Sequence, residues 1–91
     1  MMEDLLKIID KIVEDASKSF KVNKIELGRH LYDLVGKQIK GLEVIPVDNM
    51  STFIHVRAIS TTFLGKTKEF KEYGLPEGII NKYAKHFFRR A

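Results

Sequence analysis

The 91-residue chain has three histidines and no cysteine, which limits the kinds of catalytic or metal-binding site that it can form. His30, His55 and His86 show no i,i+4 spacing and no accompanying acidic cluster, so the sequence predicts no metal site. Without cysteine, disulfides, thiolate zinc sites and thiol nucleophiles are excluded. No serine or threonine stands in a recognisable nucleophile–base setting. We therefore assign no catalytic residue, no metal and no cofactor.

One polar trio has the residue types needed to act on a phosphodiester. His55 and Arg57 alternate in the segment "FIHVRAIS", so they share one face of a strand, and the expected strand pairing sets Glu43 opposite His55. His55 would act as a base and Arg57 would stabilise negative charge. The alternative is a plain polar outer face of a sheet. We favour that alternative over an enzyme.

Two further motifs fail when their spacing is examined. "GKT" at residues 65–67 suggests a phosphate-binding loop, but the glycine required five residues earlier is Ser60. A helix-turn-helix over "KIELGRHLYDLVGKQIKGL" would set its turn glycine at Tyr32 and a core position at Gln38. A turn glycine with a solvated lysine explains the first segment, and an ordinary amphipathic helix explains the second.

Composition places the chain among small soluble domains. Hydrophobic residues make up 44% of it, and no run of 18 apolar residues indicates a membrane span. The start has charge among its apolar residues, unlike a signal peptide, so we expect a cytoplasmic protein of one domain, residues 1–91. The formal net charge is +4, and residues 66–91 hold seven bases against three acids. This surplus permits nucleic-acid or acidic protein partners.

Helical periodicity dominates both ends of the chain. Apolar residues at helical spacing predict an amphipathic helix over 3–20. A capping box of Asn23 and Glu26 predicts a second helix from residue 24 to Gly41, or to Gly36 as the alternative end. Pro76 opens a third helix over 76–89. On that helix the rings of the terminal "NKYAKHFFRRA", Tyr83 and Phe87 above all, face the core, and its bases face water.

Between the helices the period changes to two. Strands near 42–47 and 52–60, with a turn at residues 48–50, predict an antiparallel hairpin. Its register sets Leu42 opposite Val56 and Val44 opposite Ile54 on one face. Pro46 marks 42–47 as an edge strand. Segment 61–74 fits a short helix capped by Thr67 slightly better than a third strand, and the whole predicts an α+β fold with the last helix on one face of a small sheet.

Part of this pattern resembles a known family. Residues 52–70, "TFIHVRAISTTFLGKTKEF", follow a helix and a strand that ends in an acidic turn. The alternating strand, Ser60 and the "FLGK" of residues 63–66 resemble the BolA-like proteins, which implies a class II KH-like α+β layer. The Arg-His pair of that family is "KE" at residues 71–72 here, and its final strand with the iron–sulfur histidine has no counterpart after residue 76. The resemblance implies a fold, and no iron–sulfur ligand is assigned.

Two binding functions follow from these observations. The first is nucleic-acid association through phosphate contacts with little sequence preference. The second is a protein-interaction module, docking on a larger partner or forming a homodimer, because apolar helix faces and an edge strand need cover. The expected phosphate contacts are Arg57, Lys66, Lys68, Lys71, Lys82, Lys85, Arg89 and Arg90.

Overall fold

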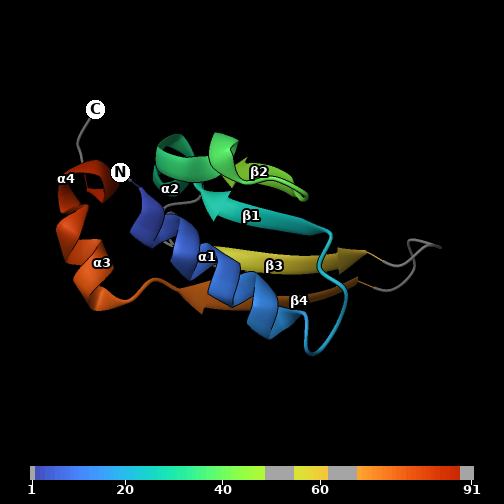
Figure 1. The fold of residues 1–91 in the computed structure, drawn as a ribbon. Helices are drawn as coiled ribbons and strands as arrows, with labels where there is room; N and C mark the ends of the chain where they lie inside the picture. The colour runs from blue at the N-terminus through green and yellow to red at the C-terminus, as the bar shows by residue number, and fades with distance from the viewer. Residues whose placement is uncertain (1, 49–54, 62–67, 89–91) are drawn as a thin grey trace.

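The chain folds around a four-stranded sheet with helices before, between and after its strands (Figure 1). The structure is a computed structural model that describes residues 2–48, 55–61 and 68–88. Its elements in chain order are α1 (Glu3–Ala16), β1 (Lys24–Gly28), α2 (Arg29–Val35), the 3-10 helix η1 (Gly36–Gln38), β2 (Glu43–Val47), β3 (His55–Thr61), β4 (Lys68–Gly74), α3 (Glu77–Lys82) and α4 (Ala84–Phe87). The strand order is β2-β1-β3-β4. The α+β class expected from the sequence is confirmed.

Helix α1 forms where the helical period of apolar residues predicts it. Leu5, Ile9, Ile12 and Ala16 are buried at spacings of three and four, which puts them on one stripe. Two acids, Glu3 and Asp4, occupy the first turn, where they complement the positive end of the helix dipole. The helix ends at Ala16 rather than near residue 20.

The predicted second helix is wrong over residues 24–28, which form strand β1. This strand pairs with β2 in parallel and with β3 in antiparallel fashion. Asn23 belongs to the same ladder: its N–H donates to the Ile59 carbonyl at 3.1 Å, and its carbonyl accepts from the Glu43 N–H at 3.3 Å. Backbone pairing on both sides overrides the helix-start signal of Asn23 and Glu26.

The helical part of that segment begins only at Arg29. Ile25 and Leu27 alternate as buried strand residues, and then Leu31 and Val35 continue as buried residues one helical turn apart. The apolar pattern thus changes period in the middle of the segment. Gly41 ends the connection to β2 with a φ of +84°, a conformation that favours glycine.

The predicted hairpin of 42–47 with 52–60 is wrong in its partners, because β1 lies between β2 and β3. Glu43 pairs with Lys24 of β1, and Val56 pairs with Leu27 of β1 and Tyr73 of β4. The expected partners at positions 53 and 54 lie outside the described residues. The expectation that Pro46 marks an edge strand is confirmed, since β2 is the first strand of the sheet.

The favoured short helix within 61–74 is also wrong over its described part, because residues 68–74 form β4. This strand pairs with β3 along its whole length, from Thr61 with Lys68 to His55 with Gly74. Thr67, the expected cap, lies outside the described residues. The C-terminal helix is divided at Tyr83, whose φ of −109° and ψ of 22° separate α3 from α4. Tyr83 and Phe87 are buried, as their helical spacing predicts.

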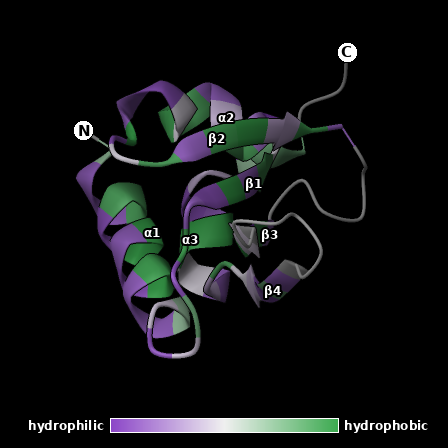
Figure 2. Ribbon diagram, turned by 90° about the vertical axis from the view of Figure 1, so that its right-hand side faces the viewer, coloured by the Kyte–Doolittle hydropathy of each residue, from purple (hydrophilic) through white to green (hydrophobic). Residues whose placement is uncertain are grey.

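One face of the sheet carries the core, and we call it the inner face. Figure 2 shows the strands from β2 to β4 with α1 to one side of them. Alternation along the paired strands turns Ile25, Leu27, Val56 and Ala58 to this inner face, where they pack in one cluster with α1, α2 and α4. No described helix covers the opposite, outer face. Among the described residues, one buried apolar side chain, Ile59, lies outside the core cluster. Alternation along β3 puts Ile59 on the outer face.

Candidate functional site

The outer face of the sheet brings together polar and aromatic side chains from all four strands. Strand register sets them in rows: Glu26 beside Arg57 beside Glu72, and Lys24 beside Ile59 beside Phe70. His55 continues the same face on β3, and Glu43, Ile45 and Val47 continue it on β2. This face holds all three residues that the sequence nominated for chemistry, with Arg57 and His55 on β3 and Glu43 on β2.

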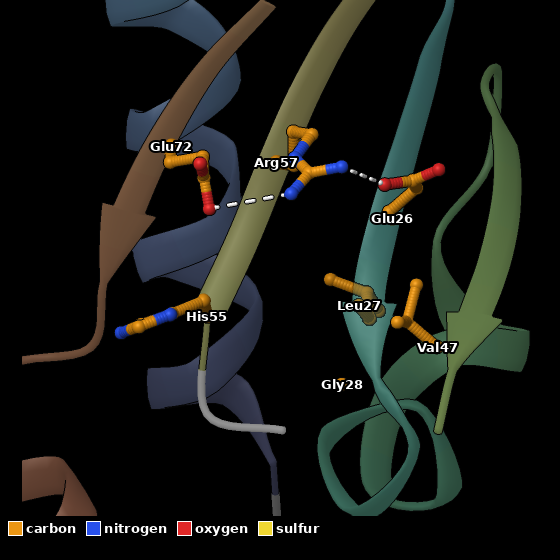
Figure 3. Close-up of a pocket in the computed structure, with 7 residues that line it drawn as sticks. All are labelled: Glu26, Leu27, Gly28, Val47, His55, Arg57 and Glu72. Carbon is orange, nitrogen blue, oxygen red and sulfur yellow. Dashed lines mark hydrogen bonds and ion pairs between the residues drawn. The ribbon is translucent and has the colours of Figure 1, made fainter. Parts of the chain in front are cut away.

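Arg57 lies at the centre of this face, between two carboxylates (Figure 3). Its Nη1 donates to Glu26 Oε1 at 2.9 Å, and its Nη2 lies 3.5 Å from Glu72 Oε2. The Arg57 side chain is 34% exposed and that of Glu26 is 21% exposed, so solvent screens the shorter pair only in part. The two acids hold the guanidinium in place and neutralise its charge.

An aromatic ring completes the environment of the guanidinium. Arg57 Cζ lies 5.2 Å from the centroid of the Phe70 ring, a cation–π geometry. Phe70 is 52% exposed, although it flanks the fully buried Ile59 across the β3–β4 ladder. Among the described residues, Phe70 and Phe88 are the large apolar side chains that are exposed.

A small hollow lies at the end of this face next to His55. It encloses about 20 Å³, room for about one water molecule, and is lined by Glu26, Leu27, Gly28, Val47, His55, Arg57 and Glu72. Within the described residues Arg57 Nε is buried without a hydrogen-bond partner. A hollow of this size is too small for an organic substrate, which needs a pocket of about 300 Å³ or more.

The predicted pairing of Glu43 with His55 is wrong. Glu43 pairs with Lys24, and Lys24 pairs with Ile59, which lies four residues after His55 on β3. Glu43 and His55 are therefore separated by about 13 Å along the strand direction as well as by β1. The phosphodiester trio proposed from the sequence is not assembled, and Arg57 has Glu26 and Glu72 as its carboxylates instead.

On the inner face, Asp15 of α1 holds two residues of β4. Tyr73 Oη donates to Asp15 Oδ2 at 2.7 Å, and Lys71 Nζ lies 3.8 Å from the same oxygen. The Tyr73 hydroxyl, and then Lys71, lower the pKa of Asp15. Burial, and then the hydrogen bond to Asp15, raise the pKa of Tyr73 to about 12. These contacts fix the C-terminal end of α1 over the last strand.

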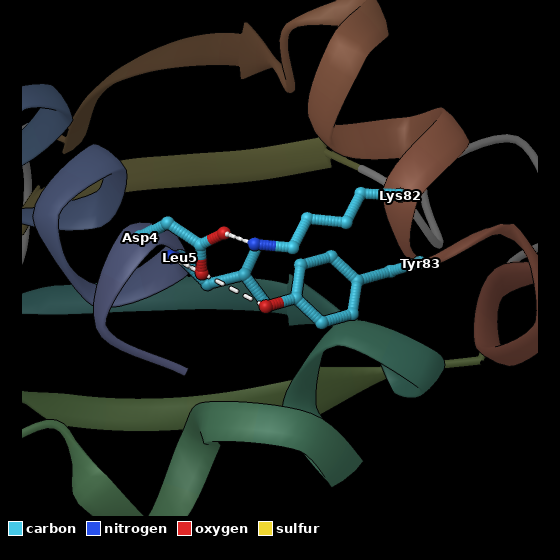
Figure 4. A network of polar contacts seen from close by, with 4 residues as sticks. All are labelled: Asp4, Leu5, Lys82 and Tyr83. Atoms are coloured by element: carbon cyan, nitrogen blue, oxygen red, sulfur yellow. Dashed lines mark hydrogen bonds and ion pairs between the residues drawn. The ribbon is translucent and has the colours of Figure 1, made fainter. Parts of the chain in front are cut away.

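A second polar network joins the two ends of the chain (Figure 4). Lys82 Nζ donates to Asp4 Oδ2 at 2.6 Å, and Tyr83 Oη donates to Asp4 Oδ1 at 2.8 Å. The backbone N–H of Leu5 donates to the same Oδ1 at 2.8 Å. The Lys82 and Tyr83 hydrogen bonds lower the pKa of Asp4 to about 2 and raise the pKa of each donor.

The described cations among the nominated phosphate contacts are scattered, and three of them lie beside carboxylates. Arg57 lies on the outer face, Lys71 beside Asp15 on the inner side, and Lys82 beside Asp4 at the end of the sheet. Lys85 is exposed on α4, and Lys68 begins β4. Lys66, Arg89 and Arg90 lie outside the described residues. The described members of the set do not form one basic surface.

Another hollow of about 400 Å³ lies between α1 and the connection from η1 to β2. Its lining is mainly apolar and includes two charged residues, Asp10 and Lys40. The full lining consists of Leu6, Ile9, Asp10, Val13, Gln38, Ile39, Lys40 and Leu42. Its lining residues include neither paired carboxylates nor a histidine. The described residues contain no group of three or more His, Asp or Glu side chains that could hold a metal ion.

Comparison with known proteins finds no match: no family model, no curated protein and no solved structure matches the chain. Within the described ranges no helix is both long enough and apolar enough to cross a bilayer.

Sequence reasoning placed Arg57 and His55 on one strand face but missed the residues around them. Glu26 was assigned to a helix, and so was Glu72, which hid their meeting on either side of Arg57. The alternation in "KEFKEYG", residues 68–74, was the available signal, since it puts Phe70 and Glu72 on one side of a strand.

Proposed function

We propose that this protein is a protein-interaction module rather than an enzyme, and that it docks a partner protein on the outer face of its sheet. The observation that supports this most is Phe70, which is 52% exposed and contacts the Arg57 guanidinium on a face that no described helix covers. Aromatic rings and arginines are enriched at the centres of protein interfaces, where they supply most of the binding energy.

The charges around Arg57 favour an apolar contact at the centre of that interface. Glu26 and Glu72 already orient and neutralise the guanidinium, so docking needs little further ordering of this side chain. Ile45, Val47 and Phe70 supply apolar surface around the pair. The complementary partner surface has an apolar centre that covers Phe70.

A nucleic acid is the alternative partner. The net charge of +4 and the exposed Lys85 support it. However, Arg57, Lys71 and Lys82 each lie next to a carboxylate, so a phosphate approaching any of them also meets a negative charge. For this reason we place protein binding first.

Affinity capture from the native host tests the proposal with a matched pair of variants. Phe70→Ser removes the outer-face ring, and Phe88→Ser removes a ring of nearly equal exposure, 52% against 54%, after α4. We expect a protein that wild type and Phe88→Ser retain equally and that Phe70→Ser retains at least about tenfold less.

Two outcomes would overturn the proposal. The first is a capture profile that does not change with Phe70→Ser. The second is micromolar or tighter binding to random DNA or RNA that weakens steeply with salt and is indifferent to Phe70→Ser, which establishes the nucleic-acid alternative.

A further inference from the structure

Among the described residues no strand pairs with the outer edge of β4. The strand is seven residues long, Lys68–Gly74, and is the last strand of the sheet. The other edge strand, β2, has five residues and contains Pro46, which lacks a donor for a further ladder. An unpaired edge presents a row of N–H and C=O groups that can pair with another strand. Among the described residues, β4 thus has the edge better suited to adding a strand.

We propose that β4 pairs antiparallel with β4 of a second copy of this chain, about a two-fold axis at Phe70. In an antiparallel pair, side chains that lie directly opposite one another are on the same face of the sheet. A two-fold axis perpendicular to the sheet satisfies this condition when one residue of the strand lies opposite the same residue of the second copy. The axes that pair at least five of the seven residues of Lys68–Gly74 are at Phe70, Lys71 or Glu72. This inference shares Phe70 with the proposed function but rests on the edge of β4, so the oligomeric state tests it separately from the capture of a partner protein.

Charge complementarity selects the Phe70 axis. With the axis there, Glu69 lies opposite Lys71 of the second copy, position 68, a lysine, lies opposite Glu72, and Phe70 lies opposite itself. Each opposite-charge pair occurs twice, because the interface is symmetric. Opposite charges directly across a ladder stabilise it, and a pair of aromatic rings does so as well.

The neighbouring registers put like charges together. An axis at Lys71 sets that lysine opposite its own copy and Phe70 opposite Glu72. An axis at Glu72 sets that glutamate opposite its own copy. Like charges directly opposite destabilise a pair of strands, so the sequence "KEFKE" of residues 68–72 specifies one register and a closed dimer.

The dimer would have eight strands and one continuous outer face. A two-fold axis perpendicular to the sheet leaves the helices of both copies on the same side. The two Phe70 rings, each 52% exposed in the single chain, would then meet at the centre of that face. This arrangement gives the exposed ring a cover that the single chain lacks.

Charge reversal tests the register. Glu69→Lys and Lys71→Glu each put like charges opposite one another in the homodimer, whereas an equimolar mixture of the two variants restores opposite charges. We expect wild type at twice the 10.5 kDa of one chain in sedimentation equilibrium, each single variant as a monomer, and the mixture again at the dimer mass. The double variant Glu69→Lys/Lys71→Glu keeps the wild-type composition and should dimerise with itself.

A single introduced cysteine provides a second, independent measurement. The chain has no cysteine, so a disulfide between two copies of Phe70→Cys reports that the position meets itself at the axis. Phe88→Cys, at an equally exposed position, is the control. Wild type that stays monomeric at about 1 mM overturns the proposal, since that is far above the concentration of a stable dimer. Single charge variants that remain dimeric, or Phe70→Cys linking no faster than Phe88→Cys, overturn the register.

Discussion

Lys82 Nζ donates to Asp4 Oδ2 at 2.6 Å, and the two residues are 78 positions apart in the chain. Tyr83 donates to the other oxygen of the same carboxylate, so one acid at the start of α1 accepts from consecutive residues where α3 meets α4. The contact fastens the C-terminal helices over the end of the sheet. It also makes Asp4 the residue through which acid should weaken this closure.

Asp4→Asn should remove part of the acid sensitivity of folding. The pKa of Asp4 is lowered from 3.8 to about 2 in the folded chain, chiefly by Lys82 and then by Tyr83. A lowered folded pKa stabilises the native state fully above pH 3.8, and that contribution is lost as the pH falls toward 2. Urea unfolding from pH 5 down to 2 should therefore show a flatter pH dependence for Asp4→Asn than for wild type.

Asp10→Asn, an exposed acid on the same helix, is the control for Asp4→Asn. It removes one carboxylate of α1 without touching Lys82 or Tyr83. If both variants flatten the profile equally, the network shown in Figure 4 is not its cause.

Tyr73→Phe should reduce the alkaline sensitivity of the fold. Burial, and then the hydrogen bond to Asp15, raise the pKa of Tyr73 from 10.0 to about 12. A raised pKa of a phenol stabilises the native state fully below pH 10, and this contribution is lost as the pH rises toward 12. Tyrosinate absorbance should show one tyrosine fewer ionising near pH 12 in the variant. A titration that matches wild type throughout this range would contradict the assignment.

Phe87→Ala and Phe88→Ala should differ sharply although they are neighbours. Phe87 is 1% exposed and belongs to the core cluster, whereas Phe88 is 54% exposed. Removing the buried ring should lower the free energy of unfolding by about 3–5 kcal/mol, and removing the exposed ring by less than about 0.5 kcal/mol. Denaturant unfolding with an unchanged m-value measures both, and equal losses would be incompatible with the packing of α4.

A double-mutant cycle should find a stronger coupling of Arg57 with Glu26 than with Glu72. The first pair is joined at 2.9 Å and the second lies at 3.5 Å, with Glu72 more exposed than Glu26. We expect a coupling on the order of 1 kcal/mol for Arg57→Met with Glu26→Gln, and a smaller one for Arg57→Met with Glu72→Gln. Unfolding in 1 M salt should reduce the second coupling more, because exposed pairs are screened more completely.

Local periodicity was enough to predict which side of β2 and which side of β3 faces the core. Val44 and Val56 were assigned to one face, and Glu43, Ile45 and His55 to the other, as the strand registers have them. It was likewise enough to predict α1 and the burial of Tyr83 and Phe87. These features depend on residues close in sequence, whose side chains alternate or recur with the period of their own element.

Pairing partners could not be predicted in the same way. A strand face is set by a period of two within one segment, but its neighbour is set by which distant segment satisfies its backbone groups. The sequence at 24–28 carries a helix-start signal, and it forms a strand only because its backbone groups pair with β2 and β3. Insertion of β1 separates Glu43 from His55 and brings Glu26 to Arg57.

The amino-acid sequence by itself therefore determined an α+β chain with an amphipathic first helix, a proline-marked edge strand and a buried aromatic face near its end. Only the tertiary structure decided the strand order, and with it the carboxylates that hold Arg57 and the exposure of Phe70. The physical reason is that hydrophobic periodicity acts within one element, whereas the hydrogen bonds of β1 join it to residues 19 positions away in β2 and 29 to 35 positions away in β3.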